Sequence, residues 1–422
     1  MRTPSQLSYT TQDMKYKILT SCMTVKNLAF QEKKLPLSRH SDNALSTRSR
    51  LYSNVSKNRP HLVDVRTDVS LKRWPTPFVD CNGNYENERF LEDLIGGPLY
   101  SEQQKLPMLP IPTIESSIDK LISSALPLAE SEEETTQFNR ACERFPDEAM
   151  YLQKRLETRR TETLNTSWLS TWWNTVGYLQ YRGPNVINVS YFFQLQDDET
   201  LPLTDKPMSI HRGACILTAM AEYRKLVCSG ALPVEKVGKK NIPLCSVSFK
   251  YMFHSSRIPL PVQDEYRLHD PSLHKHCIVA VNGQFYSLNF VDEYDNPLPL
   301  SVLEEGLQKC TQLANVQKDW PQLGIFTSSN RDVWSENYKM LVDVGGEGIK
   351  RAMQKIESAA FMICLDDQDD LTLKERAHAY WHGNPKIMTN RWFDKTIQVI
   401  VQKNGKVGLC GEHAMSDGMP MV

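Results

Sequence analysis

The sequence predicts an α/β or α+β protein built from amphipathic helices and short strands. Three observations predict this class. Segments with apolar residues at helical spacing alternate with shorter β-branched runs, two Asn-Gly pairs stand between apolar runs, and no internal repeat is detectable. With 422 residues, 40% of them hydrophobic, the chain is long enough for two lobes or for one large domain with extensions.

Composition excludes several functional classes. Lys and Arg total 49 against 50 Asp and Glu, so no overall field favours nucleic acid, and a small-molecule partner is expected. No apolar run approaches the roughly 18 residues that a membrane span requires. The ten cysteines form no C-x-x-C pair, which predicts buried thiols in a reducing compartment and neither a disulfide framework nor a zinc site.

The first 104 residues are expected to form an N-terminal extension and linker ahead of a folded region at 105–422. Residues 1–73 are basic and Ser/Thr-rich, a composition typical of a mitochondrial targeting segment or of an untargeted, mostly unstructured arm. Asp13 and Glu32 weaken the import interpretation. Folded structure is expected to begin after Gly96-Gly97.

Three helices are predicted next. The segment LPMLPIP (106–112) holds three prolines and must be extended, and Thr113 can then cap an amphipathic helix over 114–128. A second amphipathic helix is predicted at about 147–163. The aromatic segment SWLSTWWNTVGYLQYRG (167–183) is predicted as a third helix that packs through its aromatic residues.

Two hairpins are predicted in the second half of the chain. The run HCIVAVNGQFYSLNF (276–290) contains Asn-Gly between two apolar segments. The run RWFDKTIQVIVQ (391–402) alternates β-branched residues, KNGK (403–406) predicts a two-residue type I′ turn, and VGLCGEH (407–413) returns.

His413 therefore stands where a strand ends. Gly408 and Gly411 on that strand are expected to let another backbone or a ligand approach, so His413 is expected to face a cleft. Asp417 follows at i+4, where its carboxylate can lie near the imidazole or pair with an arginine that shapes the site. A neutral, oriented imidazole can take a proton near neutral pH. A satisfied surface histidine remains the alternative for these residues alone.

Other patterns point less clearly to chemistry. His378 and His382 have i, i+4 ligand spacing without a third ligand, so no metal site is predicted. His274 and His276 beside Cys277 fit a loop or core role. The glycines of VDVGGEGIKRA (342–352) lack the Walker Lys-Ser/Thr and fit a helix N-terminus. No G-x-S-x-G elbow is present.

Two long segments resemble signatures of the carnitine/choline acyltransferases. LPMLPIPTIESSIDKL (106–121) is similar to the opening signature, and RWFDKTIQVIVQKNGKVGLCGEHAMSDG (391–418) is similar to the one around the active-site histidine. Between them WLSTWWNTVGYLQYRGP, LPVEKVGKKNIPLC, GIFTSSNRDVW and ESAAFMICLDD stand in the family's order. The resemblance covers about residues 105–422. It implies an α/β lobe like chloramphenicol acetyltransferase, with a mixed sheet and flanking helices.

The same resemblance implies the N-terminal lobe of a two-lobe enzyme, and the C-terminal lobe is expected to be absent from this chain. His413 is the implied catalytic base, and Asp417 is expected to orient the local backbone or an arginine. Trp173 and Tyr178 match positions of the acceptor pocket, with core packing as the alternative. Glu412 should point to the face opposite His413 and be structural. Residues that bind coenzyme A are expected in the second lobe and are unknown here.

The implied function is reversible transfer of a short acyl group, acetyl first, between coenzyme A and the hydroxyl of carnitine. Acyl-CoA and carnitine are substrates, and neither a cofactor nor a metal is expected. Alternatives are choline as acceptor, a longer acyl chain, or a catalytically silent fragment that acts only by binding. The intact protein is expected to be a mitochondrial monomer, with peroxisome or cytoplasm as alternatives. Alone, the chain is expected to show negligible turnover.

Overall fold

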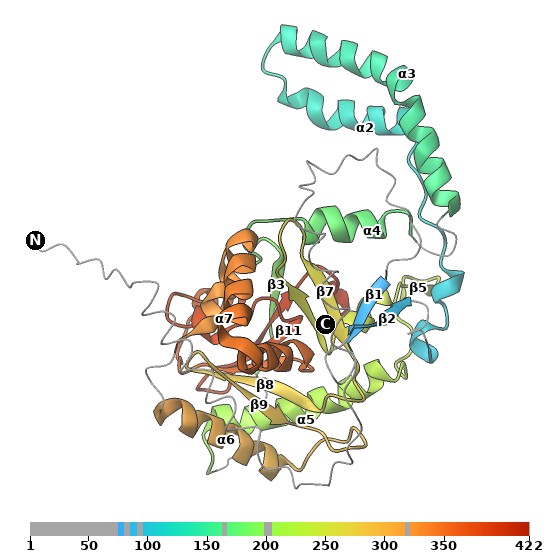
Figure 1. Ribbon diagram of the computed structural model, residues 1–422. Helices are drawn as coiled ribbons and strands as arrows, with labels where there is room; N and C mark the ends of the chain where they lie inside the picture. Colours follow the sequence, from blue (N-terminus) through green and yellow to red (C-terminus); the bar gives the residue numbers. More distant parts are fainter. Residues whose placement is uncertain are drawn as a thin grey trace, which may run out of the picture.

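The computed structural model describes residues 75–79, 85–90, 96–162, 167–197, 205–316 and 321–421 (Figure 1). The expectation for residues 1–73 lies outside these ranges. The described helices are α2 (Ile114–Ala125), α3 (Glu132–Glu162), α4 (Ser170–Trp172), a π-helix (Trp173–Leu179), α5 (Met208–Cys228), α6 (Leu300–Val316), α7 (Arg331–Ser358) and α8 (Leu373–Trp381). The described strands are β1 (Pro75–Val79), β2 (Tyr85–Phe90), β3 (Ser190–Gln194), β4 (Lys236–Val237), β5 (Ile242–Pro243), β6 (Ser255–Ile258), β7 (Glu265–His269), β8 (His276–Val281), β9 (Gln284–Asn289), β10 (Met362–Leu365), β11 (Ile397–Val401) and β12 (Val407–Glu412).

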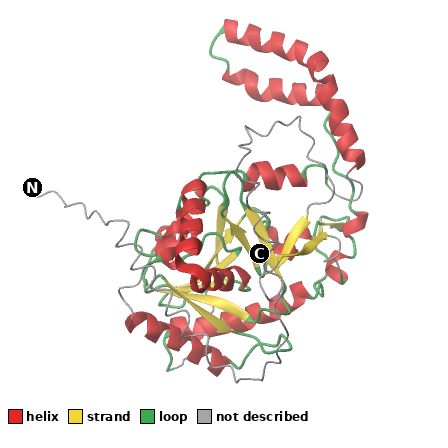
Figure 2. Ribbon diagram, in the orientation of Figure 1, coloured by secondary structure: helices red, strands yellow, loops and turns green. Residues whose placement is uncertain are grey.

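The largest sheet has six strands in the order β3-β12-β11-β10-β8-β9. Strands β8, β10 and β11 are mutually parallel, whereas β3, β12 and β9 run antiparallel to their neighbours. The sheet is therefore mixed, and helices flank it, as expected (Figure 2). Because β12 runs back along β11, with Ile397 opposite Gly411, the carboxyl end of β12 lies at the amino edge of the three parallel strands.

The two faces of this sheet bury separate apolar cores. Alternate residues of a strand point to opposite faces, so Cys277 and Val279 of β8 pack with α5 and α6. Ile278 and Ala280 of the same strand pack with α7 and α8. Buried strands of this kind read as continuous apolar runs, which is why IVAV and QVIVQ carry so little alternation.

Both hairpins form, but their turns differ. At β8–β9, Asn282 and Gly283 have φ of 52° and 74°, the type I′ geometry that Asn-Gly favours, and this prediction is confirmed. At β11–β12 the predicted two-residue type I′ turn is wrong. The Gln402 N–H donates to the Lys406 carbonyl, and the loop between them has three residues that end on Gly405 at φ 82°. A three-residue loop needs the left-handed conformation only at its last residue, where glycine stands.

Structure begins earlier than Gly96-Gly97, contrary to prediction. Strand β1 pairs with β2 and, in parallel, with β7 in a second sheet of order β2-β1-β7-β6. Strand β1 contains Pro75 and Pro77, and proline has no N–H to donate to a neighbouring strand. The register of β1 shifts between Thr76 and Phe78, so Pro77 lies at an irregularity where that N–H is not needed.

Helices α2 and α3 form an arm that stands off the body (Figure 1). Thr113 caps α2 as predicted, because its hydroxyl accepts from the Ser116 N–H at 3.2 Å. Helix α3 begins at Glu132 and not at about 147, so Pro146 lies inside it. The Ser131 hydroxyl accepts from the Glu134 N–H, and three glutamates fill the first turn, which stabilises this earlier start. The arm has its own small apolar cluster.

Two further helices depart from regular geometry. The predicted helix at 167–183 is a short α-turn followed by a π-helix over Trp173–Leu179. In α7 the helical path is broken at Gly346, with φ 58° and ψ −155°, so a second helical segment starts at the glycines where a helix N-terminus was predicted. Short 3₁₀ turns lie at Pro98–Tyr100, Gln103–Lys105, Leu126–Leu128, Val247–Tyr251, Leu323–Ser328, Met388–Asn390 and Met419–Met421.

The described cysteines are all free thiols, five of them buried, whereas Cys228 and Cys245 are exposed. Among the described helices, none is long and apolar enough to cross a membrane.

Candidate active site

His413 follows directly after β12, as predicted. Its N–H donates to the Val189 carbonyl at 3.1 Å, which ties the residue to the segment before β3. The side chain is 33% exposed, and its Nε2 lies 3.6 Å from Asp417 Oδ1. The Nδ1 atom is buried and has no hydrogen-bond partner among the described residues. The nitrogen open to a substrate is therefore Nε2.

Aromatic rings frame the imidazole of His413 on two sides. The Tyr178 ring stacks on it, with centroids 5.2 Å apart and planes at 15°, and the Tyr191 ring meets it edge-on at 5.2 Å. Trp173 contacts Tyr178 edge-to-face at 6.1 Å and is 57% exposed. Burial raises the pKa of both tyrosine hydroxyls, so they are neutral donors at physiological pH. The structure thus brings His413, Tyr178 and Trp173 together.

Tyr191 was not predicted from the sequence. It lies opposite Gly411 across the β12–β3 ladder, and a Cβ added at Gly411 would overlap the Tyr191 ring. Gly408, further along β12, leaves the same kind of space for the Tyr380 ring. The expectation that these glycines admit another backbone or a ligand is therefore wrong, because tyrosines of the same chain fill the space.

Asp417 is mostly exposed, with 69% of its side chain accessible. Its Oδ1 accepts from the Gly418 N–H, and its backbone carbonyl lies 3.3 Å from the Tyr191 hydroxyl, which also reaches the Ser416 carbonyl. Asp417 thus contributes to the turn after His413. The predicted arginine partner is not seen: within the described residues, its ion pair is with His413.

Glu412 lies on the opposite side of the strand from His413, as predicted, and is buried. Its Oε1 accepts from Arg257 Nη1 at 3.1 Å, and its Oε2 accepts from the Ala414 N–H at 3.1 Å. Burial raises the pKa of the Glu412 carboxyl to about 7, and the facing Arg257 guanidinium limits the rise.

A buried network of arginines and carboxylates contacts Glu412 through Arg257. Arg257 Nε donates to Asp264 Oδ2 at 2.7 Å, and Arg331 Nε donates to the same oxygen at 2.6 Å. Arg331 Nη1 also donates to Asp394 Oδ1 at 2.7 Å. These partners come from β6, the β6–β7 turn, α7 and the segment before β11, so the network joins the second sheet to the edge that holds His413.

A group of four histidines lies at the same edge of the six-stranded sheet. Arg224 donates to His254 Nε2, so the ring proton is on Nδ1, which donates to the Ser358 carbonyl at 3.0 Å. His276 bonds the Lys355 carbonyl at 2.8 Å. Burial lowers the pKa of His274 to about 4 and that of His276 to about 3, and holds the pKa values of His254 and His269 well below the usual range.

Lys395 is fully buried next to this group. Its ammonium donates to the Glu357 carbonyl at 2.6 Å, and burial lowers its pKa to about 7. A loop or core role was predicted for His274 and His276, and His276 is buried in the core.

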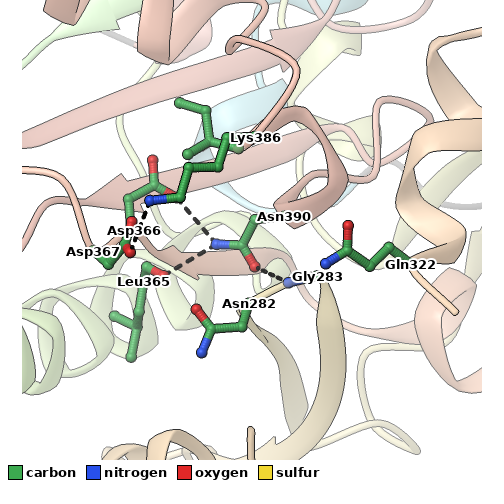
Figure 3. Close-up of a pocket in the computed structure, with 9 residues that line it drawn as sticks. Asn282, Gly283, Gln322, Leu365, Asp366, Asp367, Lys386 and Asn390 are labelled. Carbon is green, nitrogen blue, oxygen red and sulfur yellow. Dashed lines mark hydrogen bonds and ion pairs between the residues drawn. The ribbon is translucent and has the colours of Figure 1, made fainter. Parts of the chain in front are cut away.

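A pocket lies at the opposite edge of the sheet, beyond the carboxyl ends of β8 and β10 (Figure 3). Its lining residues are Asn282, Gly283, Gln322, Leu365, Asp366, Asp367, Lys386, Ile387 and Asn390. The polar groups there bond one another. Asp366 pairs with both terminal nitrogens of Arg391 at 2.9 and 2.8 Å, and the Asn390 amide bridges Asp366 to the Gly283 N–H. These groups are thus paired within the chain itself, apart from Arg391 Nε, which is buried and has no hydrogen-bond partner among the described residues.

The remaining sequence candidates do not join the His413 site. His378 and His382 lie close together on and after α8, with ring centroids 5.2 Å apart. Within the described residues, no group of three or more His, Cys, Asp or Glu side chains is arranged to hold a metal ion.

Comparison with known proteins agrees with the resemblance in the sequence. A model of the choline/carnitine O-acyltransferase family matches residues 109–422. The mitochondrial carnitine O-acetyltransferase of Saccharomyces cerevisiae is 29% identical over 363 residues, which is 81% of this chain and 50% of that protein. Human carnitine O-acetyltransferase is 30% identical over 335 residues, 76% of this chain and 52% of the human protein.

More distant relatives include the bovine mitochondrial carnitine O-palmitoyltransferase 2, which is 27% identical over 379 residues, 82% of this chain and 55% of that protein. The chain thus spans about half the length of the curated relatives it matches. Because the family model covers most of the chain, from the first predicted helix to the histidine site and beyond, this protein belongs to the choline/carnitine O-acyltransferase family.

Proposed function

We propose that this chain supplies the general base for reversible transfer of a short acyl group between coenzyme A and the hydroxyl of carnitine. The observation that carries the proposal is the position of His413 at a strand end, framed by Tyr178 and Tyr191, with Nε2 facing outward. The lobe would correspond to the chloramphenicol-acetyltransferase-like N-terminal half of such an enzyme.

The chemistry needs one base. Nε2 of His413 accepts the proton of the carnitine hydroxyl while the oxygen attacks the thioester carbon. The carbon–sulfur bond then breaks, and the imidazolium returns the proton to the leaving thiolate. No covalent acyl-enzyme, cofactor or metal is required by this route. Donors for the oxyanion of the tetrahedral intermediate are expected from a second lobe, together with the binding site for coenzyme A.

Trp173 and Tyr178 are the proposed acceptor-pocket residues. The exposed Trp173 ring beside the stacked Tyr178 offers an aromatic face of the kind that binds a trimethylammonium group. Carnitine and choline both carry that group, so the pair supports either acceptor. The family membership favours carnitine, since the relatives compared above are carnitine acyltransferases.

Acetyl is the preferred acyl group. Identities of 29–30% with carnitine O-acetyltransferases exceed those of 26–27% with carnitine O-palmitoyltransferase 2. A longer acyl chain is the second candidate, because the palmitoyl enzymes match a comparable part of the chain. Mitochondrial location is part of the proposal, since the yeast and bovine relatives carry that word in their names.

The test measures thiol release from acetyl-CoA with carnitine as acceptor, with palmitoyl-CoA and choline as competitors. The assay uses residues 1–422 and, separately, the full product of the reading frame that encodes them. Residues 1–422 alone should turn over negligibly, because His413 and Asp417 are partly open to water.

In the full product, His413→Ala should lower the rate in both directions by about 10²–10⁴-fold. His378→Ala, which changes an exposed histidine away from the site, serves as the control. Transfer that survives His413→Ala unchanged would remove His413 from the mechanism. A full product that transfers neither acyl group to either acceptor would leave only the binding role.

A further inference from the structure

Arg257 is the group that connects the two rings stacked in the site. It is buried on β6, and its guanidinium donates in three directions. Nε donates to Asp264, Nη1 to Glu412 Oε1 at 3.1 Å, and Nη2 to the Tyr178 carbonyl at 2.7 Å. One side chain therefore reaches the strand that carries His413 and the π-helix that carries its stacking partner.

On the strand side, Glu412 transmits the contact to the backbone around His413. Its two carboxylate oxygens have different partners: Oε1 accepts from Arg257, and Oε2 accepts from the N–H of Ala414. The His413 N–H, which belongs to the peptide unit between Glu412 and His413, donates to the Val189 carbonyl at 3.1 Å. The peptide units before and after His413 are thus both held, and the imidazole has little freedom to rotate with its backbone.

On the helix side, the contact is to the backbone of Tyr178 itself. The carbonyl of Tyr178 accepts from Arg257 and from the Tyr181 N–H at 3.1 Å. Fixing this carbonyl fixes the Cα–Cβ direction of Tyr178, and so the position from which its ring stacks on His413.

We propose that Arg257 is a positioning residue that sets the mutual orientation of the His413 and Tyr178 rings, through Glu412 on one side and the Tyr178 carbonyl on the other. The proposal rests on the proposed function in treating His413 as the base, yet it concerns geometry alone. A planar guanidinium has donors fixed at the angles that three separate acceptors require. A lysine ammonium at the same depth cannot reproduce all three contacts.

Arg331 provides a matched control inside the same network. It is as fully buried as Arg257, and it shares the Asp264 carboxylate. Its other side-chain hydrogen bond among the described residues goes to Asp394, and it bonds neither Glu412 nor Tyr178. Replacing either arginine by lysine disturbs a buried ion pair equally, but only one of the two replacements touches the stacked rings.

The experiment records NMR signals of the chain labelled with ¹³C at histidine Cε1, with the His413 signal assigned by its loss in His413→Gln. Tyr178→Leu gives the position of the signal without the stacked ring. Arg257→Lys should move the His413 signal most of the way toward that position. Arg331→Lys should leave the signal where it is, although both lysine variants melt at lower temperature than the parent.

Glu412→Gln tests the same proposal if Arg257→Lys does not fold. Arg257 and the Ala414 N–H donate to different oxygens of Glu412, so in glutamine one of these donors would face the NH2 group, which cannot accept, and the His413 signal should again move. A His413 signal that is unchanged in Glu412→Gln, or that moves equally in Arg331→Lys, overturns the proposal. The experiment measures the NMR signal of the His413 ring and not turnover. Failure of this proposal can therefore be told apart from failure of the proposed acyl transfer.

Discussion

Each edge of the six-stranded sheet has a buried arginine–carboxylate pair, but the two pairs hold different parts of the structure in place. At the carboxyl edge of β8 and β10, Arg391 and Asp366 form a closed pair whose partners are all internal. At the amino edge, Arg257 and Glu412 form a pair that holds a partly exposed histidine. Ligands of open α/β sheets usually bind at the carboxyl edge, whereas the site proposed here lies at the amino edge.

The reason is the direction of β12. It runs antiparallel to β11, so its own carboxyl end, with His413, reaches the amino edge of the parallel strands. The buried histidines and Lys395 gather at that same edge, whereas the pocket edge is held by the ion pair of Arg391 with Asp366. A buried ion pair by itself therefore does not indicate a functional site. A partly exposed titratable side chain that such a pair holds in place is the better indication.

Breaking the closed pair should have the largest effect on stability. Arg391→Met leaves Asp366 buried without its counter-charge and should lower the free energy of unfolding by about 3–5 kcal/mol. Urea unfolding measures the loss. Lys386→Met removes the neighbouring exposed pair with Asp367 and should cost less than about 1 kcal/mol. Equal losses in the two variants would show that the pocket edge is not held by Arg391.

A side chain added at Gly411 should displace Tyr191, one of the two rings that contact His413. Gly411→Ala places a Cβ in the Tyr191 ring and should destabilise the fold by about 1–3 kcal/mol. In a Tyr191→Leu background much of that cost should vanish, which a double-mutant cycle measures. Gly408→Ala, whose Cβ meets Tyr380, should show no such coupling to Tyr191.

Low pH should destabilise the fold through the buried histidines at the amino edge of the sheet. The pKa values of His274 and His276 are lowered to about 4 and about 3, whereas an unfolded histidine titrates near 6.5. Stability is therefore complete above about pH 6.5 and is lost as pH falls toward 4, by about 1.4 kcal/mol per pH unit for each extra proton bound on unfolding. His274→Asn should flatten the pH dependence of the urea midpoint, and His378→Gln, an exposed control, should not.

The Glu412 carboxyl should change stability with pH in the opposite direction, so that stability falls as pH rises. Its pKa is raised to about 7 in the fold, so its contribution is complete below the unfolded value near 4.5 and is lost as pH rises through 7. Glu412→Gln should therefore remove a decline in stability above about pH 5. A parent and variant whose unfolding curves stay parallel from pH 5 to 8 would contradict this.

The smallest effect is expected at Asp417. Its carboxylate is mostly exposed and 3.6 Å from His413 Nε2, a pair worth less than about 1 kcal/mol. Asp417→Asn should therefore lower the free energy of unfolding by less than about 1 kcal/mol, as measured by urea unfolding. A larger loss would mean that the carboxylate closes on the imidazole in solution.

Local signals in the sequence predicted the fold well where one segment decides its own structure. The Asn282-Gly283 turn, the Thr113 cap and the strand that ends at His413 all depend on neighbours in the chain. The start of α3 was missed: the predicted helix begins at about residue 147, whereas the helix in the structure begins at Glu132 and continues through Pro146.

The parts of the site that were missed depend on distant partners. Arg257 and Glu412 are 155 residues apart, and Tyr191 and Ser416 are 225 apart. No periodicity joins such pairs, so sequence alone cannot show that Arg257 reaches the site. A glycine in a strand did signal close approach at Gly411, but it could not show that a tyrosine ring would be the group that approaches.

The π-helix has a consequence for the chain's tolerance of changes in length. A π-turn contains one residue more than an α-turn, and Tyr178 projects from such a segment onto His413. Deleting a single residue between Trp173 and Tyr178, such as Val176, would remove that extra residue and restore α-helical winding, with Tyr178 still about one turn after Trp173 and directed to the same side. A regular α-helix has no such extra residue, so the same deletion there turns every later side chain by about 100° around the axis. The π-helix is therefore the part of this segment where the loss of one residue should disturb the direction of Tyr178 least.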